Sequence, residues 1–253
     1  MHENKLQDIE ESLRGTLIKL YLRRSAVLTE QGCFSEALID CQTAKDRLED
    51  IFGLGCSPPN GIDLNDINAD IARLENVVAA DKLKKEADAS FGDGSLDLAI
   101  EKYTEALTIV PCHVSCLSNR SACFMALGDL SHCLEDCSSA LDILELNVSQ
   151  LQKMHGVKSR QLTMSSALIP PVGSQKRKDW TLKTLARRGA ANIQLGNIED
   201  AIRDYGFAVS IDPSNEALKT DLTRLKNTYE FSSTTQTIDK FDDLKTGTSS
   251  ATN

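Results

Sequence analysis

The chain has 253 residues, of which 41% are hydrophobic, so it can bury a core larger than that of one average domain. Its 28 basic and 37 acidic residues give a formal charge of −9, opposite in sign to most nucleic-acid-binding proteins, so nucleic acid is not expected as a partner. It has no run of 18 apolar residues, and its first thirty residues are charged throughout, which predicts neither a membrane span nor a secretory signal.

The first predicted element is one long helix over residues 4–30, in which apolar residues recur at helical spacing. This helix and the segment after it form a helical hairpin at residues 18–51. Residues 53–61 are expected to be a loop, because three glycines and two prolines fall within them. No proline or glycine interrupts the chain from 65 to about 91, which predicts a second long helix. That helix covers the first hairpin and then begins the next one.

Two further hairpins follow in strict frame at residues 80–113 and 114–147. The next 34 residues do not fit the frame. Helix is expected to continue to about Met154 and to give way to an inserted loop at about 155–178, which contains two adjacent prolines, two glycines and several serines. The last hairpin then occupies residues 182–215.

The C-terminal part of the sequence predicts a cap and a tail. Residues 216–229 have the pattern of an amphipathic helix, whose leucines would cover the apolar surface that a terminal hairpin exposes. The Ser/Thr-rich residues 230–253 are expected to be disordered. The elements group into a partial set of repeats at 1–64 and a three-repeat domain at 65–229.

The first hairpin resembles the last one in sequence. The stretch Lys19-Leu-Tyr-Leu-Arg-Arg-Ser-Ala26 matches Lys183-Thr-Leu-Ala-Arg-Arg-Gly-Ala190. The first hairpin is therefore expected to be the last repeat of another three-repeat set, whose earlier members are absent from this sequence. Whether the chain is a fragment stays open at this point.

Four copies of one local pattern define the hairpins. Each copy has a glycine, a small residue seven positions before it, and packing residues two, five, nine and twelve positions after it. The four glycines are Gly32, Gly94, Gly128 and Gly196, and the last three are separated by 34 residues and by twice 34. This period and layout are typical of tetratricopeptide repeats. We predict an all-α right-handed superhelix of such helix-turn-helix repeats with a C-terminal capping helix, and a concave face that binds rather than transforms its ligand.

Polar residues on the first helices of the last three hairpins are predicted to converge on that concave face. They are Lys84, Asp88, Asn119, Lys183 and Arg187. Three cations and an amide in one groove of a negatively charged protein favour an extended acidic peptide or a C-terminal carboxylate, because arginine can hold a carboxylate through two hydrogen bonds. The basic residues 176–178 would add to the local positive field.

These positions resemble the dicarboxylate clamp of co-chaperone tetratricopeptide domains, such as those of the Hsp-organising protein. The resemblance covers about residues 80–229. It implies that Lys84, Asn119, Lys183 and Arg187 hold the Glu-Glu-Val-Asp C terminus of the seventy- and ninety-kilodalton heat-shock chaperones. The carriers are Lys84-Lys-Glu-Ala-Asp88, Ser118-Asn-Arg-Ser-Ala122 and Lys183-Thr-Leu-Ala-Arg187.

Asp88 departs from the clamp pattern, which has asparagine at this position. Its carboxylate would face the carboxylate of the ligand, with a repulsion of about 4 kcal/mol at 4 Å and an effective dielectric near 20. Pairing with Lys84 would reduce that repulsion. Binding then either survives in weakened form or selects a different terminus. The alternative, in which these residues form an ordinary solvated helix face, stays open.

Within co-chaperone arrays the sequence is most similar to the C-terminal repeats of the dynein axonemal assembly factor family that includes the dyslexia-susceptibility candidate. Sperm-associated antigen 1 and related assembly proteins are similar too. The family implies cytoplasmic folding of axonemal dynein arms with heat-shock chaperones, association with the cilium, and dynein chains or other assembly factors as partners. The CS-type domain of that family is absent here, and the hairpin at 18–51 is extra. The carriers are 117–123, 186–189, 204–205 and 211–215.

Other chemistry is not indicated. Three of the eight cysteines lie on packing columns of the repeats, as expected in a reducing compartment. Cys112, His113 and Cys116 lie close together but lack a fourth ligand at fitting spacing, so no metal site is predicted. No nucleophile–base–orienter set stands out. We therefore expect no catalytic residues, no cofactor and no enzyme activity.

Trp180 has two interpretations, stacking on a ligand or sealing the last hairpin against the inserted loop, and the second is favoured. Two other functions also stay open. One is a structural scaffold of a cilium or another complex, in which the clamp residues are idle. The other is the regulatory module of an enzyme whose catalytic part lies outside this sequence.

Overall fold

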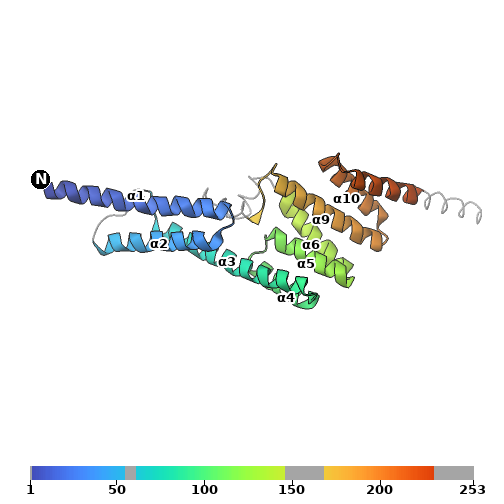
Figure 1. The fold of residues 1–253 in the computed structure, drawn as a ribbon, viewed down its shortest axis with the longest axis horizontal. Coiled ribbons are helices and arrows are strands. Elements are labelled where there is room, and N and C mark those ends of the chain that lie inside the picture. The colour runs from blue at the N-terminus through green and yellow to red at the C-terminus, as the bar shows by residue number, and fades with distance from the viewer. Residues whose placement is uncertain (1, 55–60, 146–167, 231–253) are drawn as a thin grey trace, which may run out of the picture.

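The computed structural model describes residues 2–54, 61–145 and 168–230, and for residues 2–8 and 11 it describes the backbone only. Within these ranges the regular elements are all α-helices (Figure 1). The helices are α1 (His2–Glu30), α2 (Phe34–Gly53), α3 (Leu64–Gly92), α4 (Leu96–Ile109), α5 (Val114–Leu127), α6 (Leu130–Glu145), α9 (Gln175–Gln194), α10 (Ile198–Ile211) and a last helix at residues 216–230. None of the helices among these residues is both long and apolar enough to cross a membrane.

The helices pair into the four predicted hairpins, α1 with α2, α3 with α4, α5 with α6, and α9 with α10. Figure 1 shows the hairpins following one another along the long axis of the molecule. The turn of each hairpin contains one of the four pattern glycines, and the φ angles of these glycines lie between 77° and 80°. Residues with a Cβ rarely adopt this left-handed conformation, which explains why glycine recurs there. The prediction of an all-α tetratricopeptide superhelix is confirmed.

Small residues let the two helices of each hairpin approach closely. The residues five and twelve positions after each glycine are all fully buried, and all are alanine except Cys133. The residue seven positions before the glycine faces the residue nine positions after it. In the first hairpin Ser25 Oγ lies 3.0 Å from Cys41 Sγ. In the last hairpin a Cβ at Gly189 would lie 2.7 Å from the ring of Tyr205. In both hairpins at least one of the two facing residues is therefore small.

One hydrophobic core joins the first hairpin to the later ones through α3. Ile67 and Leu74 in the N-terminal half of α3 are buried in the same cluster as residues of α1 and α2, and Ala87 near its C-terminal end is buried with residues of α4. The side chain of Asp63 caps the start of this helix by accepting a hydrogen bond from the backbone of Asn65. Because α3 runs unbroken from 64 to 92, its single helix serves both hairpins, as predicted.

The segment before the last hairpin differs from the prediction. The loop was expected to reach residue 178, but α9 begins at Gln175, where the side chain of Ser174 caps it. Leu168, Ile169 and Pro170 are buried, which fixes the chain just before that cap. The prediction of a loop at about 155–178 is therefore wrong for residues 175–178, which belong to α9. The reason is that this segment seals the core rather than leaving it.

The side chain of Arg177 also helps to hold this segment against the core. It is buried and donates hydrogen bonds to the carbonyl oxygens of Pro170, at 2.9 Å, and Leu144. The expectation that residues 176–178 jointly strengthen the field of the groove is therefore wrong for Arg177, which joins α9 to the end of α6. Lys176 lies over the ring of Trp180, with its Nζ 5.1 Å from the ring centroid. Trp180 itself packs against the main core, as the sealing interpretation expects.

The remaining predictions concern the C-terminal end and the ranges outside the described residues. The capping helix is present at 216–230, and Leu218 packs against the buried Leu185 and Ala208. The predicted helix end near Met154, the first part of the predicted loop, and the predicted tail beyond 230 lie outside the described residues. The division of the chain at residue 64 stays a prediction.

Candidate peptide-binding groove

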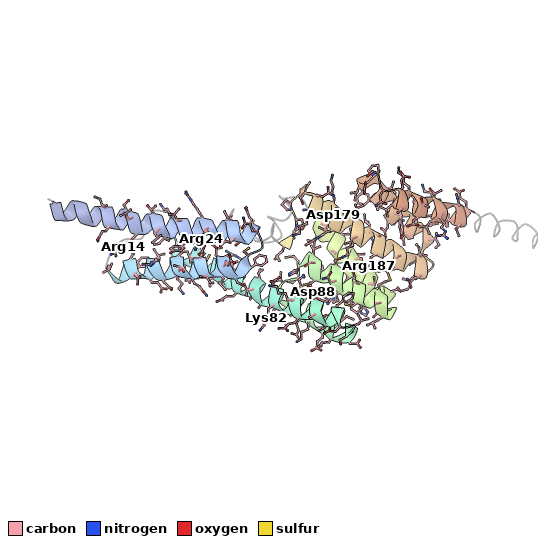
Figure 2. The ribbon with its side chains drawn as sticks, in the orientation of Figure 1. Arg14, Arg24, Lys82, Asp88, Asp179 and Arg187 are labelled. Atoms are coloured by element: carbon pink, nitrogen blue, oxygen red, sulfur yellow. The ribbon has the colours of Figure 1, made fainter. Side chains whose placement is uncertain are left out.

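The five predicted site residues lie on the first helices of three successive hairpins. Lys84 and Asp88 are one helical turn apart on α3, Asn119 is on α5, and Lys183 and Arg187 are one turn apart on α9. Figure 2 labels Asp88 and Arg187 on their helices. Helical spacing of four residues gives both members of each pair a common face, and the packing of α3, α5 and α9 in sequence decides whether these faces meet.

Asp88 is the centre of the contacts on the α3 side. Its Oδ2 forms an ion pair with Lys84 Nζ at 2.6 Å. Its Oδ1 accepts a hydrogen bond of 2.5 Å from the hydroxyl of Tyr103 on α4 and one of 2.9 Å from the amide of Asn119 on α5. The pairing of Lys84 with Asp88 that the sequence suggested is present. Asp88 thus joins three helices through one carboxylate.

These contacts determine the charge of the carboxylate. Burial acts to raise the pKa of Asp88, but hydrogen bonds from Lys84, Tyr103 and Asn119 outweigh burial and hold that pKa below its ordinary value. Asp88 is therefore ionised at neutral pH and neutralises the charge of Lys84. Burial, together with the hydrogen bond to Asp88, raises the pKa of Tyr103, so its hydroxyl remains a donor.

Arg187 forms the contacts on the α9 side. Its Nη1 donates to the backbone carbonyl of Ser118 at 2.5 Å, to Ser118 Oγ at 3.2 Å and to Ser121 Oγ at 3.0 Å. Among the described residues its Nε and Nη2 atoms have no such acceptor. Arg187 is half-buried, whereas Lys183 is exposed and has no hydrogen bond or ion pair within the described part of the chain.

The structure therefore connects four of the five predicted residues through α5. Asn119 contacts Asp88, which pairs with Lys84, and the neighbouring Ser118 contacts Arg187. Lys183 shares a helix face with Arg187 but is not held by this network. Sequence reasoning missed Tyr103, Ser118 and Ser121 as partners. The repeat pattern places Tyr103 at a packing position, nine residues after Gly94. The fold shows that its hydroxyl also reaches Asp88 on the other helix of the hairpin.

A second set of charges, also missed, joins the two helices in three of the four hairpins. An arginine eight positions before the turn glycine pairs with an aspartate eight positions after it in three hairpins. The shortest distances are 2.5 Å in Arg24–Asp40, 2.7 Å in Arg120–Asp136 and 2.6 Å in Arg188–Asp204. The hairpin of α3 and α4 has the charges reversed, as Glu86 and Lys102, but there Lys102 forms its ion pair with Glu105 on its own helix, at 2.9 Å. The regular spacing of 16 residues was available in the sequence as a signal.

The cysteine and histidine candidates remain packing residues. The described residues contain no group of three or more His, Cys, Asp or Glu side chains that could hold a metal. Burial lowers the pKa of His113 to about 4 and raises that of Cys116 to about 12, so the imidazole is neutral and the thiol is protonated at pH 7. Within the described residues, no disulfide is formed by Cys33, Cys112, Cys116, Cys123, Cys133 or Cys137.

Comparison with known proteins supports the repeat assignment. No family model matches the chain. The heat shock protein STI1 of Saccharomyces cerevisiae is 28% identical over 155 residues, which are 60% of this chain and 20% of that protein. Dynein axonemal assembly factor 4 of Pongo pygmaeus is 27% identical over 168 residues, which are 65% of this chain and 34% of that protein. The chain thus spans about a fifth to a third of the length of these relatives.

Solved structures with a similar course of the chain have low scores. The first TPR of Spaghetti (RPAP3), bound to an HSP90 peptide, aligns with a TM-score of 0.45 at 21% identity, over 61% of this chain and 95% of that one. The Hsp90 co-chaperone Cns1 of Saccharomyces cerevisiae aligns with a TM-score of 0.47 at 21% identity, over 68% of this chain and 46% of that one. The chain thus has the fold of tetratricopeptide repeats by its own repeat geometry, and its sequence resembles the heat shock protein STI1 and dynein axonemal assembly factor 4.

Proposed function

We propose that the chain is a protein-binding adaptor that holds an acidic peptide in the groove formed by α3, α5 and α9. The observation that supports this most is the position of Arg187. Its contacts with Ser118 and Ser121 keep a guanidinium of α9 against α5, beside Asn119, while part of the guanidinium stays available. Lys183 adds a second cation one turn away. A protein with a net charge of −9 that keeps two such cations on one helix face has a local preference for acidic ligands.

The strength of binding follows from this arrangement. A solvent-exposed ion pair contributes up to about 1 kcal/mol, and an arginine that grips a carboxylate through two hydrogen bonds contributes more. Two such contacts, with backbone hydrogen bonds and apolar contacts of an extended peptide, correspond to a dissociation constant of roughly 1 to 100 µM. Such an affinity suits an adaptor that exchanges its partners.

The proposed partners are the C-terminal tails of the seventy- and ninety-kilodalton heat-shock chaperones. Sequence similarity to the heat shock protein STI1 and to the Hsp70-Hsp90 organizing protein of Triticum aestivum, which is 25% identical over 147 residues, supports this choice. The similarity to dynein axonemal assembly factor 4 supports a narrower proposal, a cytoplasmic role in assembling axonemal dynein arms. Restoration of the arms in deficient ciliated cells by the wild-type chain, but not by Arg187→Ala, tests the narrower proposal.

Calorimetry with a Glu-Glu-Val-Asp peptide tests peptide binding directly. We expect Arg187→Ala to weaken binding about tenfold, which is the loss of about 1.4 kcal/mol. Arg23→Ala is the matched control, because Arg23 occupies the same repeat position on α1, away from the three hairpins of the groove. Equal binding by all three proteins, or no binding by any of them at millimolar peptide, would exclude the groove as the peptide site.

A further inference from the structure

Asp88 occupies its own groove in the way that a ligand carboxylate would. A carboxylate can accept about four hydrogen bonds. In Asp88 three of these positions are filled, by Lys84 on Oδ2 and by Tyr103 and Asn119 on Oδ1. The ammonium of α3 and the amide of α5 are the donors that an incoming carboxylate would need on this side of the groove. Both already bind Asp88.

The contacts of Asp88 are difficult to replace. A ligand carboxylate that took Lys84 and Asn119 would leave a second negative charge beside it, partly shielded from water, and like charges in such a position repel. Tyr103 strengthens this arrangement, because its side chain is buried and its hydroxyl cannot turn to follow the ligand. The α3 side of the groove is thus electrically neutral, because the carboxylate of Asp88 compensates the charge of Lys84 and also holds one donor of Asn119.

The positive charge that remains for a ligand lies on α9. In the described residues neither Lys183 nor Arg187 is paired with a carboxylate, and Arg187 uses only Nη1 in its contacts with α5. The two side chains are one helical turn apart, about 6 Å, so they can receive acidic side chains that project from a peptide. A terminal carboxylate would find no uncompensated cation at Lys84 and Asp88 on α3, because these two residues are paired with each other.

We propose that the groove recognises acidic side chains within a peptide through Lys183 and Arg187, and that it does not require the free terminal carboxylate of that peptide. This inference rests on the proposed function, because it specifies the ligand of the same groove. The inference goes further than the proposed function, because it predicts that the groove binds an acidic segment inside a longer chain as well as one at the end of a chain.

Three peptides test the proposal by calorimetry: Glu-Glu-Val-Asp with a free C terminus, the same peptide with an amidated C terminus, and Gln-Gln-Val-Asn with a free C terminus. For the wild-type chain we expect the amide to bind within about twofold of the free acid. The Gln-Gln-Val-Asn peptide should bind at least tenfold more weakly. A tenfold or greater loss on amidation would overturn the inference while leaving the proposed function intact, because the free acidic peptide would still bind the groove.

The variant Asp88→Asn provides the second arm. Removing the internal carboxylate frees Lys84 and Asn119, so this variant should gain a preference of about tenfold for the free acid over the amide. Asp81→Asn is the matched control, because Asp81 lies on the same helix but forms its ion pair with Lys85, at 2.9 Å, and not with Lys84. Circular dichroism establishes that each variant is folded. If the amide and the free acid bind Asp88→Asn equally, the role given to Asp88 is wrong. If no peptide binds any of the proteins, the proposed function is lost together with this inference.

Discussion

The first and last hairpins carry the same sequence motif in different surroundings. In both, a lysine is followed four and five residues later by two arginines, at Lys19 and at Lys183. The second arginine forms the same ion pair in both hairpins, Arg24 with Asp40 and Arg188 with Asp204. The first arginine does not behave alike. Arg187 reaches α5 of the preceding hairpin, whereas Arg23 is exposed and has no partner within the described residues.

The ion pair is thus a contact that one hairpin forms by itself, whereas the contact of Arg187 with α5 needs two hairpins stacked on each other. The tie between the two helices of a hairpin needs only residues 16 positions apart, so local sequence is sufficient to form it. The groove contact needs a neighbouring first helix, so the same arginine becomes part of a site only where another hairpin precedes it. Binding is therefore a property of successive hairpins rather than of the motif.

Removing the arginine of the Arg188–Asp204 ion pair should reduce stability more than removing the arginine of the Arg24–Asp40 ion pair. Arg188→Ala should lower the free energy of unfolding by about 3 kcal/mol, because it leaves the carboxylate of Asp204, 5% exposed, without its partner. The Asp40 side chain is 3% exposed, but Arg24→Ala should cost less, because the Arg24 side chain is 64% exposed and its removal opens that side of the pair to water. Urea denaturation measures both. Arg203→Ala, at an exposed pair with Asp200, is the control and should change stability little. Equal losses from Arg24→Ala and Arg188→Ala would contradict the role of burial.

The buried imidazole of His113 should make the stability of the protein fall at acidic pH. The pKa of His113 is about 4 in the folded protein, below its ordinary value near 6.5, so the unfolded chain binds more protons between these values. Stability should therefore fall as the pH is lowered from 7 to 5, by about 2 kcal/mol. Denaturation of wild type and His113→Gln at both pH values measures this loss. The loss should be smaller in the variant, and an unchanged pH dependence would show that His113 is not its source.

Enlarging Gly189, which faces Tyr205 on α10, should reduce stability more than enlarging its counterpart Ser25, which faces the smaller Cys41. Gly189→Ala should destabilise the protein by about 1.5 kcal/mol, because crowding of the Tyr205 ring outweighs the better helix propensity of alanine. Tyr205→Cys recreates the smaller partner found at Cys41. In that background Gly189→Ala should cost little or even stabilise, and a double-mutant cycle by thermal denaturation measures the coupling. A cost that is equal in both backgrounds would mean that the contact is not responsible.

The smallest expected effect concerns the two equivalent lysines. Lys183→Ala should weaken binding of an acidic peptide about threefold, since an exposed ion pair contributes well under 1 kcal/mol. Lys19→Ala should leave the affinity unchanged, because Lys19 lies on α1. Calorimetry at low salt gives the best resolution, and the effect of Lys183→Ala should diminish as salt is added. A larger effect of Lys19→Ala than of Lys183→Ala would locate the ligand on the first hairpin instead.

The sequence predicts most of the helical framework because the framework repeats. The helix expected at 4–30 extends over residues 2–30, and the one expected at 65–91 covers 64–92. Both are set by helical spacing and by turn glycines, which are local signals. The start of α9 was missed because nothing periodic marks it. It is fixed by Arg177, whose acceptors Pro170 and Leu144 are brought to it only by the fold.

The candidate site was predictable as a set of residues but not as a set of contacts. The repeat frame predicts that Lys84, Asp88 and Asn119 face the same groove, and the pairing of the first two follows from their spacing of four. The hydrogen bond from Tyr103 to Asp88 depends on how closely α4 packs on α3, which no pattern within one helix records. The ion pairs at a spacing of 16 are the opposite case, since three copies of the pattern were present in the sequence and were overlooked.

The long helix α3 has a mechanical consequence. Its 29 residues form a single rod of roughly 44 Å, whose beginning is anchored in the core of the first hairpin and whose end presents Lys84 and Asp88. A stiff rod turns as a unit, so a force or a partner that tilts the first hairpin swings the far end of α3 by the same angle. The distance between α3 and α9, and with it the width available to a peptide, is thereby coupled to what happens at the opposite end of the array.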